Sequence, residues 1–150
     1  MTLSITETDY EKKLTDRELK KECFLFAREN FQGKFFNNSH TGRDILVSRN
    51  GLDEWYSKTK SRDQALSIKQ LGKMLENSKL IGESGDNYKR LYVEGFVYFS
   101  VLCKVNETEY DATITIKQTK GNPENFYCYY LQNIKIKPCS GNGTSSENPI

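Results

Sequence analysis

The feature that most constrains the fold of this chain is a change of hydrophobic periodicity near residue 88. Before that point, apolar residues recur at helical spacing in two segments, whereas after it apolar and polar residues alternate. A period of 3.6 residues places apolar side chains on one face of a helix, and a period of two places them on one face of a strand. Helices followed by a run of strands predict an α+β domain, with the N-terminal helices packed on one face of an antiparallel sheet.

Helical patterns account for much of the first half of the chain. Thr15 and Glu18 have the spacing of a capping box and precede an amphipathic stripe, which predicts a helix over residues 16–30. A second stripe predicts a helix over residues 63–76, and residues 52–56 begin a further helical stretch. These helices supply the apolar stripes that would cover the sheet.

Strand patterns flank and follow these helices. Residues 34–37 and 44–49 border a turn-forming segment, which predicts a short hairpin. Gly95 is expected to mark a bulge in the first of three longer strands. Those strands are predicted over residues 89–105, 109–118 and 126–136. The prediction is therefore a sheet of about four antiparallel strands, with a meander in the C-terminal half, plus the hairpin.

The length of 150 residues suits one domain. Residues 15–138 are expected to form this domain, between a flexible N-terminal segment over 1–14 and a flexible tail or linker over 139–150. No apolar run approaches the ~20 residues of a membrane span, and the N-terminus lacks a signal-peptide pattern. None of the four cysteines forms a C-x-x-C pair. We therefore expect a cytoplasmic domain with reduced cysteines and without a metal, a cofactor or a membrane partner.

The chemistry of the exposed sheet face suggests a nucleic-acid partner. The net charge of +2 is too small to predict one by itself. The polar face of the predicted sheet, however, mixes lysines that can contact phosphate, hydroxyls that can bond ribose and tyrosines that can stack on bases. The alternative is an ordinary half-exposed sheet, because these residue types suit strands in any case. The RNA hypothesis nominates Lys58, Lys60, Arg62, Tyr98, Thr115, Tyr127 and Tyr129 as binding residues.

A catalytic version of the hypothesis needs groups that stabilise phosphate charge. Arg49 and Arg90 are expected at strand ends, where a guanidinium can hold a phosphate, the alternative being structural ion pairs. Lys117 would act as an electrostatic stabiliser and Ser100 as a hydrogen-bonding group, completing the predicted catalytic set. His40 is interpreted as an ordinary turn residue and, as the single histidine, excludes catalysis by paired imidazoles.

Short motifs along the chain carry a family resemblance. The sequence FARENFQGKFFN at residues 26–37 is followed by ILVSRNGL at 45–52, a helical motif at 71–81 and a strand motif from 90 to 117. In this order they resemble the large polyvalent protein-associated domains of phage and mobile-element polyproteins, over roughly residues 22–136. The positions that match the family motifs include Ser48, Arg49, Gly51 and Lys117.

The resemblance carries functional expectations. That family is similar in turn to the barnase–EndoU–colicin–RelE-like nuclease fold, which implies a toxin-like, metal-independent ribonuclease or an inactive relative that binds RNA. Many members carry a histidine near the position of Arg90-Leu91-Tyr92, where this chain has none, so degenerate activity is expected. The alternative is a non-catalytic protein-interaction module with a protein partner, such as an accessory protein or host-defence inhibitor. A spacer domain in a longer polyprotein is a third hypothesis.

Overall fold

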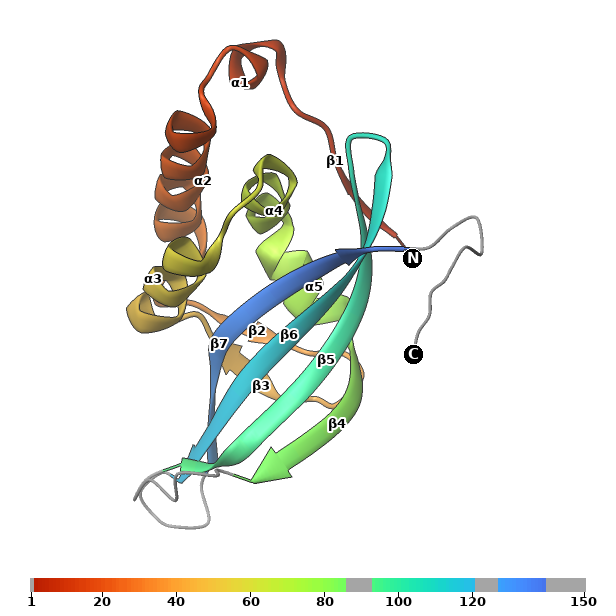
Figure 1. Cartoon of the computed structure of the whole chain (residues 1–150). Helices are drawn as coiled ribbons and strands as arrows, with labels where there is room; N and C mark the ends of the chain where they lie inside the picture. Colours follow the sequence, from red (N-terminus) through yellow and green to blue (C-terminus); the bar gives the residue numbers. More distant parts are fainter. Residues whose placement is uncertain (1, 86–92, 121–126, 140–150) are drawn as a thin grey trace.

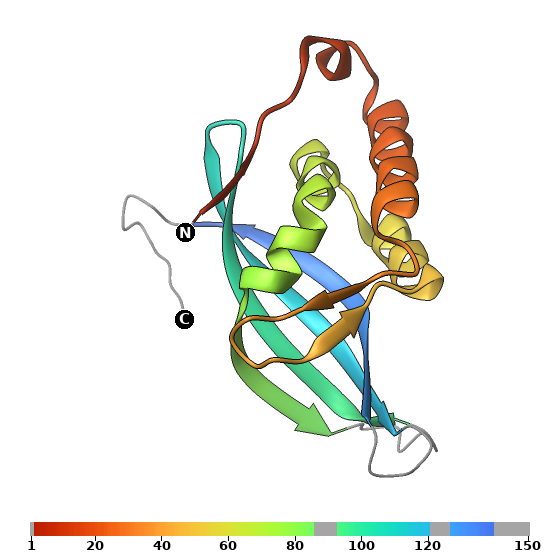
Figure 2. The ribbon, with the colours of Figure 1, turned by 180° about the vertical axis from the view of Figure 1, so that it is seen from behind.

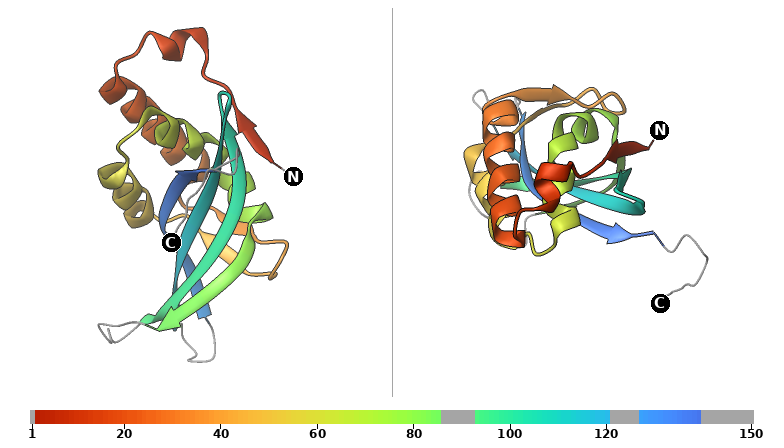
Figure 3. Two further views of the ribbon diagram at one scale, coloured as in Figure 1. Left: turned by 45° about the vertical axis from the view of Figure 1, so that its right-hand side comes forward. Right: turned by 90° about the horizontal axis from the view of Figure 1, so that it is seen from above.

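The protein folds as a strongly curled mixed sheet with its helices gathered on one side. The computed structural model describes residues 2–85, 93–120 and 127–139 (Figure 1). Within these residues the sheet has seven strands. Their order is β1 (Leu3–Ile5), β5 (Val93–Val105), β6 (Thr108–Lys120), β7 (Tyr127–Pro138), β3 (Asp44–Leu46) and β2 (Phe35–Asn37), and β4 (Lys79–Gly85) also pairs with β5. The helices lie on the inner side of the curl, as Figures 2 and 3 show from behind and from above. The α+β class is confirmed, but the prediction of about four antiparallel strands was wrong.

The helices follow the predicted stripes with one interruption. Helix α2 (Asp16–Phe31) begins with the expected capping box, in which the Thr15 hydroxyl accepts the Glu18 amide at 3.1 Å and the Glu18 carboxylate accepts the Thr15 amide at 2.9 Å. Helix α3 (Arg49–Lys58) is longer than predicted. The helix predicted over residues 63–76 divides into α4 (Arg62–Ser67), a 3-10 turn (Ile68–Gln70) and α5 (Leu71–Asn77).

The predicted hairpin and meander are both present. β2 (Phe35–Asn37) pairs antiparallel with β3 (Asp44–Leu46), and β5 (Val93–Val105), β6 (Thr108–Lys120) and β7 (Tyr127–Pro138) form the meander. β4 (Lys79–Gly85) extends it along β5. The bulge expected at Gly95 is confirmed by a shift of register there, where an added Cβ would lie 2.3 Å from the Ser84 carbonyl oxygen.

Two parallel pairings were not predicted. β3 pairs parallel with β7, and β1 (Leu3–Ile5) pairs parallel with the end of β5. Part of the segment expected to be flexible thus has regular structure, including α1 (Asp9–Lys12). Arg62 ties this segment to the domain, because its guanidinium donates to Glu7 at 2.5 Å and to the Leu14 carbonyl oxygen at 2.9 Å.

The core lies between the helices and the inner face of the sheet. The apolar face predicted for the long strands is buried, from Val97 to Val105 on β5 and from Ala112 to Ile116 on β6. Trp55 of α3 and Met74 of α5 are fully buried against it. Among the described residues, no helix is long and apolar enough to cross a membrane.

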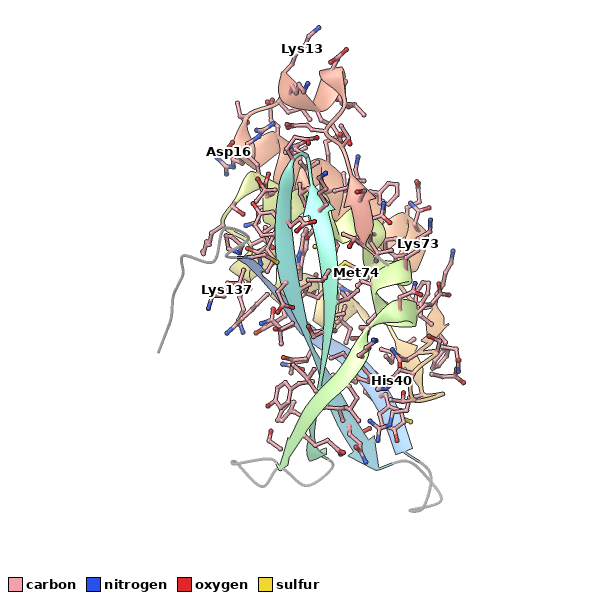
Figure 4. The ribbon with its side chains drawn as sticks, turned by 90° about the vertical axis from the view of Figure 1, so that its right-hand side faces the viewer. Lys13, Asp16, His40, Lys73, Met74 and Lys137 are labelled. Carbon is pink, nitrogen blue, oxygen red and sulfur yellow. The ribbon has the colours of Figure 1, made fainter. Side chains whose placement is uncertain are left out.

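Hydrogen bonds from side chains, rather than strand pairing, connect the β2–β3 hairpin to α5 and to β4. The side-chain amide of Asn38, fully buried, donates to the carbonyl oxygens of Leu75 and Ser78, both at 2.8 Å. The Leu80 amide of β4 donates to His40 Nδ1 at 3.1 Å, and Figure 4 shows His40 beside that strand. His40 therefore anchors the hairpin turn to β4, a structural role that its position in a polar turn did not reveal.

Candidate nucleic-acid interface

A row of side chains crosses the sheet on the face opposite the buried core residues, here called the outer face. Leu46 of β3 stands opposite both Phe35 of β2 and Tyr130 of β7. Tyr130 stands opposite Lys117 of β6, which in turn stands opposite Phe96 of β5. Residues that stand opposite each other on paired strands share a face. The register therefore places one lysine within a row of aromatic and aliphatic side chains.

Helix α3 reaches this face because it packs closely on β7. An added Cβ at Gly51 would lie 2.2 Å from the Leu131 carbonyl oxygen, so the approach requires glycine. Ser48 caps the helix, its hydroxyl accepting the Gly51 amide at 3.1 Å. The first amides of a helix have no intrahelical acceptor and carry partial positive charge. The packing at Gly51 thus sets this positive end beside the outer face.

The helix end and the sheet enclose an open pocket of about 470 Å³, here called the α3 pocket. Its lining includes Ser48, Asn50, Glu54, Lys117, Thr119 and Tyr130. The Glu54 carboxylate is already paired with Lys58 Nζ at 2.5 Å. Lys117 has no ion-pair partner among the residues that the structure describes. The α3 pocket therefore combines an unpaired cation with a helix N-terminus.

Tyr130 forms one wall of this pocket as a neutral phenol. Burial raises its pKa above the ordinary value, and a hydrogen bond with the Cys128 side chain raises it further. An uncharged aromatic ring beside a cation and a helix N-terminus can stack on a planar group without repelling an anion bound next to it.

The predicted catalytic residues are brought together only in part. Lys117 lines the α3 pocket, and Arg49 is the first residue of the helix whose N-terminus lines it. Arg90 lies outside the described residues. Ser100 is on the outer face but donates to Asp111 at 2.7 Å, and it pairs with Thr113, four positions from Lys117 along β6. At about 3.3 Å per residue, that places Ser100 roughly 13 Å away from the lysine.

The predicted stacking tyrosines divide between the two faces. Tyr98 and Thr115 stand opposite each other on the outer face, as expected. Tyr129 does not share that face: it stands opposite buried Ile45, and its ring lies under the Arg43 guanidinium at 5.1 Å. Tyr130 occupies the outer-face position that was predicted for Tyr129. The side chain of Tyr127 lies outside the described residues.

None of the three basic residues of the linker lines the α3 pocket. Lys58 is the last residue of α3 and is paired with Glu54, which does line it. Lys60 is exposed two residues further on. Arg62 is held by the N-terminal segment, and its bonds to Glu7 and Asp16 raise its pKa. Of the three, Lys60 alone has no acidic partner among the described residues.

The sequence analysis nominated neither Asn50 nor Tyr130, and it named Ser48 only as a position that matches the family motifs. Residues 44–49 were read as one strand, although Ser48 stands three residues before Gly51, where a helix N-cap would bond. In the part of the chain that the structure describes, no group of three or more His, Cys, Asp or Glu side chains is placed to hold a metal ion. All four cysteines are free, and burial raises the pKa of Cys23 and of Cys103 to about 11.

These features define a class of small α+β domain, in which a helix end and a curled mixed sheet frame a polar pocket. The sequence model of large polyvalent protein-associated domain 3 matches residues 15–127, and the chain belongs to this family. The match runs from α2 to the start of β7, so β1, α1 and Tyr130 lie beyond it. Comparison with curated proteins and with solved structures gave no match. The family resemblance is thus confirmed, whereas the further similarity to a nuclease fold is not.

Proposed function

We propose that this domain binds single-stranded RNA in the α3 pocket. The observation that carries the proposal is that Lys117, the N-terminal turn of α3 and the Tyr130 ring line one pocket. A helix N-terminus offers backbone amides to a phosphate, and a lysine adds a full positive charge. An adjacent aromatic ring supplies a platform on which a base can stack.

The charges around the pocket favour a phosphate ligand. Lys117 would neutralise one phosphate directly. Arg49 has a side chain that is 79% exposed, and its ion pair with Asp53 is long, at 3.8 Å. Such a pair on the surface contributes little, so a phosphate could replace the carboxylate at low cost. Lys117 and Arg49 can therefore contact the same stretch of the RNA backbone.

The apolar part of the row favours a single strand over a duplex. Leu46 and Phe35 continue the face beyond Tyr130, and Phe35 is 66% exposed. Bases can reach such a surface only when they are unstacked from their neighbours. Stacking contributes about 1–3 kcal/mol per base and tolerates any base. We therefore expect binding with little sequence preference, in the cytoplasm.

The proposal is restricted to binding. Ser100, a member of the predicted catalytic set, donates its hydroxyl to Asp111. His40, which was predicted to be an ordinary turn residue, accepts the Leu80 amide of β4. Metal-independent cleavage remains a prediction of the family resemblance, and the binding experiment can record it on the same oligonucleotide.

Fluorescence anisotropy with a labelled 12-nucleotide uridine oligomer tests the proposal. Lys117→Gln should weaken binding several-fold and lower the slope of log affinity against log salt by roughly 0.7, the value for one phosphate contact on a single strand. Lys13→Gln is the matched control, because Lys13 (labelled in Figure 4) is exposed at the end of α1 and does not line the pocket. Equal effects of the two variants, or wild-type binding that does not depend on salt, would refute RNA binding at this pocket. A protein captured in stoichiometric amount with no RNA affinity would support the alternative of an interaction module.

A further inference from the structure

A second pocket, of about 500 Å³, adjoins the first across Tyr130 and is here called the Arg43 pocket. It is built from the hairpin and β7, and its lining includes Phe35, Arg43, Asp44, Leu46, Tyr129 and Tyr130. Its volume lies within the range of about 300–1,000 Å³ that is typical of small-molecule sites. The RNA proposal uses Tyr130, Leu46 and Phe35 of this lining as a surface for bases, but it gives no role to Arg43.

The walls of the Arg43 pocket are largely carbon. Phe35, Leu46 and Tyr130 come from neighbouring strands in one row of the register. Phe35 is 66% exposed, which is unusual for a phenylalanine that a strand holds in place. A flat apolar ligand entering between these side chains would remove this ring from water and gain roughly 25 cal/mol for each Å² of apolar surface it buries.

Arg43 gives the pocket one defined charge. Its guanidinium lies over the Tyr129 ring at 5.1 Å from the centroid, so its position is fixed by a cation–π contact. Its Nη1 atom is buried and has no hydrogen-bond partner within the described residues. The neighbouring Asp44 carboxylate does not pair with it and accepts instead from the Asn37 side-chain amide at 2.8 Å.

Nη1 lies beneath the surface, so an anion in the pocket reaches it only if the atoms that cover it shift, and the unmet donor favours that shift. Arginine presents two parallel N–H groups that match the two oxygens of a carboxylate. Since the pocket holds one unpaired cation beside apolar walls, it fits a ligand with one negative charge and a flat apolar body. We propose that the Arg43 pocket binds a small aromatic carboxylate, with the ring against Phe35 and Leu46 and the carboxylate on Arg43.

Titration followed by amide chemical shifts tests this site with three probes on the wild-type protein. Phenylacetate should give saturable shifts at Gly42, Leu46 and Tyr129. Phenylacetamide keeps the ring but lacks the charge, and its affinity should be lower by at least about tenfold. Acetate lacks the ring and should cause no saturable shift. If the amide binds as well as the acid, or if none of the three produces shifts in this pocket, the proposal is wrong.

Variants of Arg43 then test whether its guanidinium binds the carboxylate. Arg43→Gln should lose at least about tenfold in phenylacetate affinity, and Arg43→Lys should fall between it and the wild type because it keeps the charge but not the two-pronged geometry. Arg17→Gln, at an exposed position of α2, is the matched control and should bind as the wild type does. Retained affinity in Arg43→Gln with a wild-type amide spectrum would overturn the assignment. RNA binding through Lys117 is unaffected by this result, so the two proposals fail separately.

Discussion

Replacing Asn38 by alanine is expected to destabilise the domain more than any other single loss of a polar side chain in the hairpin. The side chain is fully buried and donates to the carbonyl oxygens of Leu75 and Ser78. Its own oxygen accepts the backbone amides of His40 at 3.1 Å and of Thr41 at 2.9 Å. The alanine variant would remove these four bonds, and two more that join the side chain to the hydroxyls of Ser78 and Thr41, and would leave buried backbone groups without partners.

The magnitude follows from those four bonds. A net contribution of about 1 kcal/mol for each gives a loss of roughly 3–5 kcal/mol in the free energy of unfolding. For a chain of this length, that loss lowers Tm by roughly 6–20 °C. Asn38→Asp should be at least as severe at neutral pH, because it removes the two donors and turns a buried carboxylate toward two carbonyl oxygens.

Urea unfolding followed by circular dichroism measures this loss. Asn37→Ala is the matched control, since Asn37 is exposed and its side chain donates to the Gly42 carbonyl oxygen and to Asp44 at the surface. We expect the control to lose less than about 1 kcal/mol. Equal losses in Asn37→Ala and Asn38→Ala, at an unchanged dependence on urea, would show that the buried bonds do not hold the hairpin to α5 and β4.

Two further predictions concern other parts of the structure. Gly51→Ala should lower the free energy of unfolding by at least about 2 kcal/mol and displace α3 from β7, because the added Cβ would lie 2.2 Å from the Leu131 carbonyl oxygen. Gly82→Ala is the control: its Cβ would meet nothing within 4 Å, and urea unfolding should show almost no change. Burial raises the pKa of Glu11, but hydrogen bonds from Lys69 and from the Thr8 backbone outweigh it and hold that pKa below the ordinary 4.5. The stability that ionised Glu11 contributes is therefore present above about pH 4.5 and is lost as the pH falls through the lower folded-state pKa. At pH 7, Glu11→Gln should have a lower free energy of unfolding than the wild type, and this difference should shrink below pH 4.5. A difference that stays constant with pH would contradict this.

Local signals in the sequence predicted the elements of the fold well. The capping box at Thr15 and Glu18 and the alternation along β5 and β6 depend on residues a few positions apart, and both are confirmed. The parallel pairing of β3 with β7 and of β1 with β5 joins segments that are far apart in the chain. No period within either segment encodes such a pairing, which is why the mixed sheet was not predicted.

The candidate site was predicted less completely, for a reason visible in β7. Leu131 and Ile134 are both buried although they stand three residues apart, because a shift of register between them changes which face each residue occupies. A strict alternation carried from one end of the strand to the other therefore selects Tyr129 where the structure has Tyr130. Lys117 lies on β6, whose pairing with β5 is regular there, and was assigned to the correct face.

Tyr130 lines both pockets, so ligands bound at the two proposed sites would be thermodynamically linked. A phenol ring can take one orientation at a time, so a ligand that fixes it for one pocket also chooses the shape of the other. If an aromatic carboxylate changes the affinity for RNA by some factor, then RNA must change the affinity for the carboxylate by the same factor. A single side chain at the boundary between α3 and the hairpin would then allow a small metabolite to report on, or to regulate, a nucleic-acid ligand.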